Sequence, residues 1–118
     1  MEKISKVTYF FHKRKYQAGE IVFKEGEQSK YIYLIKKGEI ELEKEVEIPV
    51  NNDKELLRAT VRVAKLTKKE YFGDCDLIFN RERYFTAISS TSSSVYFCEA
   101  MQFMKIVEES KIFMEMFA

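Results

Sequence analysis

The chain has 118 residues, of which 46% are hydrophobic and 14% aromatic, a composition typical of one folded domain with a single core and not of a disordered segment. Its 20 lysines and arginines almost balance its 19 aspartates and glutamates, which argues against a protein whose main partner is nucleic acid. Charges interrupt the first apolar residues and no run reaches the roughly 18 apolar residues of a membrane span, so we expect neither a signal peptide nor direct membrane insertion.

The first elements in chain order are a charged run and three strands. We interpret residues 12–15, HKRK, as a solvated loop, and we predict a short strand at Ile21–Phe23 that ends at Gly26. Apolar residues at even spacings within residues 31–48 predict two further strands. The interruption Lys36-Lys37-Gly38 predicts a tight turn between them, with the glycine at positive φ.

The next segments combine strands with polar connections. Residues 56–66 alternate again, with one face formed by Ala59, Val61 and Val63 and the other by Thr60, Arg62 and Ala64. Before them, residues 48–55 contain the single proline, Pro49, and are expected to form an exposed loop between two strands. The run SSTSSS at residues 89–94 has the composition of a linker, but apolar residues flank it, so we predict a strand with small polar side chains.

Helical periodicity is found only at the ends of the chain. The spacing of Ala100, Phe103, Met104 and Val107 predicts an amphipathic helix. Ser110 is a candidate cap for a second helix, and because that helix is still apolar on one face at its last residue, we expect it to continue further. Many short strands followed by helices predict a mainly β fold, a roll or barrel flanked by helices.

The residues for most catalytic chemistry are missing. The single histidine, His12, lies among cations, no spacing resembles a zinc site, and no glycine-rich phosphate loop is present. The two cysteines, Cys75 and Cys98, form no CxxC pair and are expected to be reduced, as in the cytoplasm. We therefore expect a protein that is not an enzyme and has no cofactor, and that acts as a ligand-binding switch or an interaction module.

The four glycines indicate a family. They occur as AGE, EGE, KGE and FGD at residues 18–20, 25–27, 37–39 and 72–74, and residues 71–87 then read YFGDCDLIFNRERYFTA. This order, with an arginine nine residues after Asp74 and a helix further on, resembles the cyclic-nucleotide-binding domain of kinase regulatory subunits, cyclic-nucleotide-regulated channels and catabolite activator proteins. The resemblance extends from about Tyr16 to Phe117.

The resemblance implies one cyclic-nucleotide-binding-like domain over residues 1–118. Its expected core is a jelly-roll-like, eight-stranded β-roll at about residues 16–98, with helices at both ends and C-terminal helices at about 99–118. Between two strands, at about residues 72–84, the family has a phosphate-binding cassette with a short helix. The implied ligand is cyclic AMP or cyclic GMP.

The same resemblance assigns roles within the cassette. Asp74 takes the position of the glutamate that accepts the ribose 2′-hydroxyl, and Arg83 takes that of the arginine that pairs with the cyclic phosphate. Backbone N–H groups after Gly73, including that of Cys75, complete the anion cradle, and Tyr84 faces the base. Elementary chemistry agrees, because an arginine fork matches two phosphate oxygens and a glycine lets the backbone approach a ligand closely.

Two acidic residues depart from the family pattern. Asp74 is one methylene shorter than the usual glutamate, so its hydrogen bond to a sugar would stretch unless water bridges it. Asp76 replaces a small neutral residue, and at about 6 Å from a phosphate its repulsion would be about 3 kcal/mol at an effective dielectric constant of about 20, roughly a hundredfold in affinity. Alternatively, Asp76 points to solvent in the first helical turn, where a carboxylate is favoured.

Bulky residues also follow the arginine. Tyr84 replaces a small residue and would either stack on the purine or occupy its space, whereas Phe85 is expected in the core. Arg81 is an alternative phosphate ligand in a shorter register, but the spacing from Asp74 favours Arg83.

The sequence is compatible with two main functions. In the first, the domain binds a cyclic nucleotide and passes a shift of its C-terminal helices to a neighbouring kinase, channel or other effector domain of a larger signalling protein. In the second, the domain is degenerate: Asp74 or Asp76 pairs with Arg83, Tyr84 fills the purine space, and the module has an interaction or structural role. A pocket retuned to another purine nucleoside is a third, less supported alternative.

Overall fold

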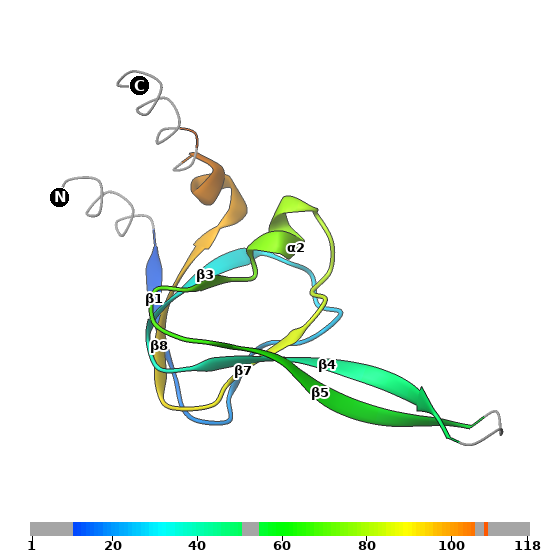
Figure 1. Ribbon diagram of the computed structural model, residues 1–118. Coiled ribbons are helices and arrows are strands. Elements are labelled where there is room, and N and C mark those ends of the chain that lie inside the picture. The colour runs from blue at the N-terminus through cyan, green and yellow to red at the C-terminus, as the bar shows by residue number, and fades with distance from the viewer. Residues whose placement is uncertain (1–10, 51–54, 106–107, 109–118) are drawn as a thin grey trace, which may run out of the picture.

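Two antiparallel sheets form the domain. The computed structural model describes residues 11–50, 55–105 and 108, and within them eight strands divide equally between the sheets (Figure 1). In the order of their pairing, the first sheet contains β1 (His12–Tyr16), β8 (Ser93–Glu99), β3 (Tyr31–Lys37) and β6 (Tyr71–Phe72). The second contains β2 (Ile21–Phe23), β7 (Thr86–Ser89), β4 (Ile40–Pro49) and β5 (Leu56–Leu66). The mainly β, eight-stranded architecture is therefore confirmed.

The chain passes repeatedly from one sheet to the other. Gly38, at φ +96°, makes the predicted turn, but the strands that it joins, β3 and β4, belong to different sheets. A side chain at Gly38 would overlap Ser93, at the start of β8. β3 pairs instead with β8 and β6, and β4 pairs with β7 and β5. The local turn was therefore predictable, whereas the pairing of the strands was not.

Two segments differ from the sequence-based expectations. Residues 12–15 are not a loop: they belong to β1, an exposed edge strand whose backbone pairs with β8 along its whole length. Within the serine-rich run, Ser89 and Ser93 lie in strands, but residues 90–92 form the connection between β7 and β8, so the predicted continuous strand is wrong there. Pairing with β8 decides the first case and the passage of the chain from one sheet to the other decides the second, so local composition decides neither.

The hydrophobic core lies between the two sheets. It includes residues of β6 and β7, the strands that precede and follow the short helix α2 (Asp74–Ile78) in the chain. Its fully buried members include Ile35 on β3, Ile40 on β4 and Val95 on β8. The rings of Tyr33 and Phe72 stack with their centroids 4.9 Å apart. Burial of each large apolar side chain contributes about 1.5–3 kcal/mol, so the ends of the segment that contains α2 are firmly held.

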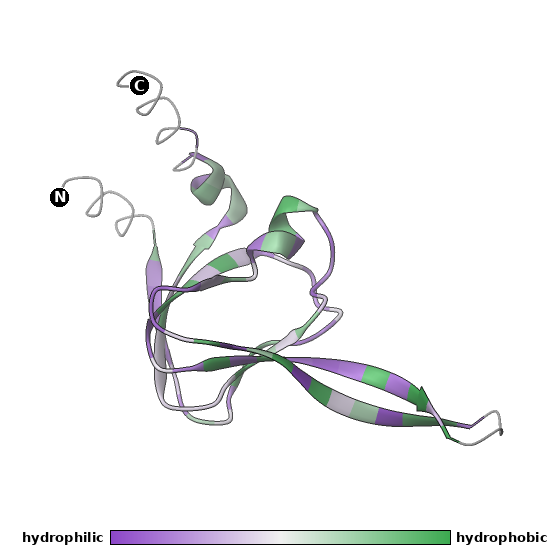
Figure 2. Cartoon of the chain, in the orientation of Figure 1, coloured by the Kyte–Doolittle hydropathy of each residue, from purple (hydrophilic) through white to green (hydrophobic). Residues whose placement is uncertain are grey.

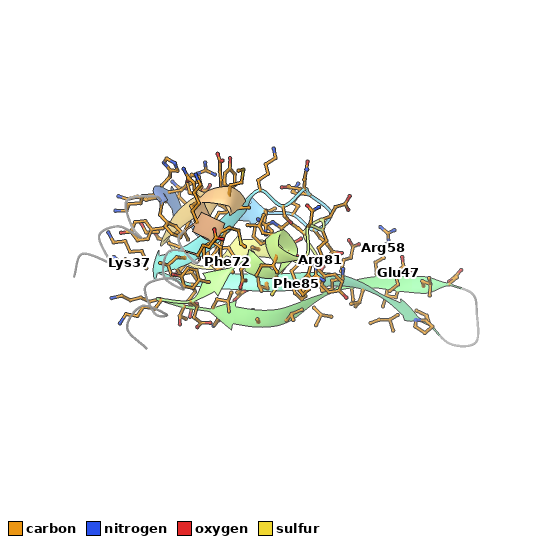
Figure 3. The ribbon with its side chains drawn as sticks, turned by 90° about the horizontal axis from the view of Figure 1, so that it is seen from above. Lys37, Glu47, Arg58, Phe72, Arg81 and Phe85 are labelled. Atoms are coloured by element: carbon orange, nitrogen blue, oxygen red, sulfur yellow. The ribbon has the colours of Figure 1, made fainter. Side chains whose placement is uncertain are left out.

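β4 and β5 extend from the roll as a long hairpin (Figures 1 and 2). On one face of the hairpin, the cross-strand pair Ile48 and Leu57 exposes apolar side chains to solvent. On the other face, Glu47 and Arg58 lie opposite each other and form an ion pair. Figure 3 labels this charged pair on the hairpin. A bulge between Leu42 and Glu43 breaks the predicted alternation, because Arg62 and Ala64, predicted to share a face, pair with these two adjacent residues of β4.

Helical structure accompanies the roll. Residues 100–105 are helical, within the predicted helix, and Phe103 packs on the cluster around Ile32. The predicted second helix from Ser110 and the N-terminal flank lie outside the described residues. No helix in the described part of the chain is long and apolar enough to cross a membrane.

Candidate ligand-binding site

The candidate site is the segment from β6 through α2 to β7. After β6, Gly73 takes φ +79° and α2 starts at the next residue, so the glycine makes the sharp turn into the helix. α2 ends at Ile78, and Asn80, at φ +49°, then turns the chain back. The returning segment is fixed by two backbone hydrogen bonds of 2.8 Å, from the N–H of Arg83 to the carbonyl of Glu27 and from the N–H of Gly26 to the carbonyl of Arg83.

The guanidinium of Arg83 is held inside this segment. The residue is 3% exposed, and its Nη1 donates to the carbonyl oxygen of Gly73 at 2.7 Å. Its Nη2 donates to the carbonyl oxygen of Tyr31 at 2.6 Å, and the group lies 4.1 Å from the ring centroid of Phe23. Burial lowers the pKa of Arg83 from its usual value, and the nearby Tyr33 and Asp76 act in the opposite direction. The fold therefore fixes the position of this positively charged side chain in the protein without ligand.

Asp76 shares its carboxylate between two arginines. The residue is 6% exposed, and its Oδ1 accepts a hydrogen bond from Nε of Arg81 at 2.9 Å. Its Oδ2 lies 3.6 Å from Nη1 of Arg83, close enough for an ion pair but too far for a hydrogen bond. The alternative in which Asp76 points to solvent is thus wrong, because the arginines on the segment that follows α2 draw it inward.

Tyr84 lies at the edge of an open hollow. It is 50% exposed, and Nζ of Lys44 lies 4.0 Å from its ring centroid. Lys44 also donates to the carbonyl oxygen of Tyr84 at 3.1 Å and to Oε2 of Glu25 at 2.8 Å. The hollow, about 470 Å³, brings together residues 81–84 with Glu25 and Gly26 of the β2–β3 turn and Lys44 of β4. Its volume lies within the range of small-molecule sites.

Comparison with known proteins identifies the fold. The family model of the cyclic nucleotide-binding domain matches residues 13–110. The chain belongs to the cyclic nucleotide-binding domain family. It is 29% identical over 99 residues to a cGMP-dependent protein kinase of Plasmodium berghei, and the match covers 83% of this chain but 10% of the kinase.

Solved structures share the cyclic nucleotide-binding fold at lower identity. The catabolite activator protein of Thermus thermophilus superposes with a TM-score of 0.77 and 18% identity, over 93% of this chain and 47% of that one. The regulatory domain of Toxoplasma gondii PKA, crystallised with cAMP, has a TM-score of 0.76 and 18% identity, over 97% and 41%. The chain thus spans less than half of each of these proteins, and at this identity the likeness shows the fold alone.

Within this cyclic nucleotide-binding domain, the predicted site residues are only partly brought together. Gly73 and Arg83 are in contact, and Arg83 and Tyr84 line the same hollow. Asp74, half-buried, lines a different and smaller hollow of about 30 Å³ that faces the helix at residues 100–105. Cys75 is exposed at the start of α2.

Sequence reasoning missed two residues of the hollow, Lys44 and Glu25, and misplaced Phe85, a neighbour of the hollow in the chain. Lys44 and Glu25 lie about twenty residues apart in the chain and meet only because the hairpin base packs beside the β2–β3 turn. In the sequence they are ordinary charged residues of strands and turns, and no local signal distinguishes them. Phe85, expected in the core, is only partly buried and packs edge-on against Tyr84 at 4.9 Å, because it precedes β7.

Proposed function

We propose that this chain is a regulatory module that binds a cyclic nucleoside monophosphate, cyclic AMP or cyclic GMP, at the hollow beside Arg83. The observation that carries the proposal is the pre-set guanidinium of Arg83, held by the carbonyls of Gly73 and Tyr31. An arginine has five N–H donors, and these two hydrogen bonds use only two of them. Donors that are already fixed lose little conformational entropy when an anion binds. The ligand phosphate therefore belongs at Arg83.

The remaining site residues follow from the family. We assign Gly73 to the close approach of the backbone, and the N–H groups at Asp74 and Cys75 to the phosphate. The carboxylate of Asp74 accepts the ribose hydroxyl, through water where one methylene is missing. Tyr84, half-exposed at the edge of the hollow, stacks on the purine. These assignments require Asp74 to turn from the smaller hollow toward Arg83 when the ligand binds.

The partner is an effector domain of a larger signalling protein. The relatives support this, because the matched kinase is about ten times longer than the matched segment and the Toxoplasma structure is a regulatory domain. A ligand acts as a switch only if it binds one state more tightly than the other. We assign the helix at residues 100–105, next to α2, as the element that passes the change to a kinase, channel or other effector. Two unpaired cysteines agree with a cytoplasmic location.

Calorimetry tests the proposal directly. We expect cyclic AMP or cyclic GMP to bind with a dissociation constant in the micromolar range or below, and 5′-AMP to bind more weakly. Arg83→Ala should abolish binding, while Arg62→Ala, which removes an exposed arginine of the hairpin, should leave it unchanged. If neither cyclic nucleotide produces heat at millimolar concentration, the proposal is wrong.

A second candidate is a ligand-independent interaction module, and one observation favours it. The buried carboxylate of Asp76 already lies 3.6 Å from Arg83, where it balances part of the charge that a phosphate would balance. In this case the natural chain binds neither nucleotide, whereas the double variant Asp76→Ala, Tyr84→Ala gains binding. A double variant that binds no better than the natural chain would contradict the second candidate.

A further inference from the structure

Asp76 has two positively charged neighbours but hydrogen-bonds to only one of them. Its bond to Nε of Arg81 is 2.9 Å long, whereas its separation from Nη1 of Arg83 is 3.6 Å. The side chains of Asp76 and Arg83 are 8% and 2% exposed, while that of Arg81 is 47% exposed. The half-exposed arginine thus holds a buried carboxylate beside the buried arginine.

We propose that Asp76 is an internal competitor for the anion that binds Arg83, and that Arg81 sets how strongly it competes. This inference rests on the proposed function, because the competition concerns a ligand phosphate at Arg83. The carboxylate lies close enough to Arg83 to balance its charge in the unliganded protein. A ligand phosphate at the same guanidinium must therefore approach a second negative charge.

Arg81 reduces that repulsion in two ways. Its positive charge balances Asp76 directly, at hydrogen-bonding distance, and the bond keeps the carboxylate from closing the remaining gap to Arg83. Without Arg81, Arg83 is the remaining arginine in contact with Asp76 among the described residues, and the carboxylate is expected to bond to it. Two like charges a few ångströms apart in partly buried surroundings change an affinity by about tenfold or more.

The backbone makes Arg81 well placed for this role. Its N–H donates to the carbonyl oxygen of Asp76 at 2.9 Å, so the two residues are joined through backbone and side chain together. The turn at Asn80, with φ +49°, brings Arg81 back over α2. Both residues of the pair therefore belong to the cassette itself, and Ser29 supports the returning segment from outside it, because its Oγ donates to the carbonyl oxygen of Arg81 at 2.6 Å.

A double-mutant cycle tests the inference by calorimetry with cyclic AMP and cyclic GMP. Asp76→Asn keeps the size of the side chain and removes its charge, so we expect about tenfold tighter binding. Arg81→Ala should weaken binding by about tenfold in the natural background and change it little in the Asp76→Asn background. Arg62→Ala, an exposed arginine paired with Glu41 at 3.3 Å, controls for the loss of one positive charge.

The possible outcomes separate the inference from the proposed function. If the natural chain binds and Asp76→Asn binds no tighter, the inference is overturned and the function stands. If only the two proteins that carry Asp76→Asn bind, the inference is supported and the natural chain is not a sensor. Binding by none of the four proteins overturns both. If Asp76→Asn does not fold, as judged by circular dichroism, the comparison of Arg81→Ala with Arg62→Ala decides, and equal affinities overturn the inference.

Discussion

The side chain of Arg83 occupies the space that a side chain at Gly73 would need. A Cβ atom at Gly73 would lie 2.7 Å from Nη1 of Arg83, and the same nitrogen donates to the carbonyl oxygen of Gly73. The glycine and the arginine of the family motif are therefore one structural unit, ten residues apart in the chain. The backbone turn and the position of the cation depend on each other.

Gly73→Ala should cost more stability than the matched change Gly19→Ala. Both glycines have positive φ, at +79° and +90°, but nothing lies within 4 Å of a Cβ at Gly19. We expect a loss of about 1 kcal/mol at Gly19 from backbone strain alone, and about 2–3 kcal/mol at Gly73, where the side chain also displaces Arg83. Urea denaturation measures both values. Equal losses would show that Arg83 can move aside freely.

Arg83→Ala should destabilise the unliganded protein as well as remove its ligand contact. The carbonyls of Gly73 and Tyr31 each lose a charged hydrogen-bond donor, and Asp76 loses one of its two cations. We expect a loss of at least about 2 kcal/mol in the free energy of unfolding. Arg83→Lys should recover only part of it, because an ammonium group lacks the fork that reaches both carbonyls. A loss no larger than the roughly 0.5 kcal/mol expected for a surface arginine would contradict this role.

The thiol of Cys98 should make stability fall at alkaline pH. Cys98 is completely buried, and burial raises its pKa from 9.0 to about 11. Between these values the native state keeps a proton that the unfolded chain loses, so the free energy of unfolding decreases as the pH rises from about 9 to about 11. In Cys98→Ala the decrease should be shallower, as measured by denaturation at several pH values. Cys75→Ala, which changes an exposed thiol, is the control and should keep the slope of the natural chain.

Glu25 should contribute the opposite dependence at acid pH. Nζ of Lys44 at 2.8 Å, and then the backbone N–H of Glu45 at 3.1 Å, lower the pKa of Glu25 below its usual 4.5. The stabilisation is therefore present above about pH 4.5 and is lost as the pH falls further. Both side chains are partly exposed, so solvent screening limits the effect to less than about 1 kcal/mol. Glu25→Gln should have a flatter acid limb in denaturation experiments than Glu47→Gln, which changes an exposed pair on the hairpin.

Predictions from the sequence were accurate where one residue constrains its own backbone. Gly38 has the positive φ that its turn requires, and the alternating runs are strands. Predictions failed where the partner is distant. The charged run at residues 12–15 is a strand because β8 pairs with it, and residues 90–92 are a turn because the chain changes sheets there.

The sequence by itself determined the family and the place of its cassette, because the order of the four glycines at turns and the spacing of Asp74 and Arg83 are local features of the chain. Only the tertiary structure decided the state of Asp76. Its neighbours in the chain allow it to face water, but the turn at Asn80 brings back Arg81 and Arg83, and two buried or half-buried cations draw a carboxylate inward. The charge balance inside the cassette depends on the distances between side chains in the folded structure, and these distances do not follow from the spacing of the residues in the sequence.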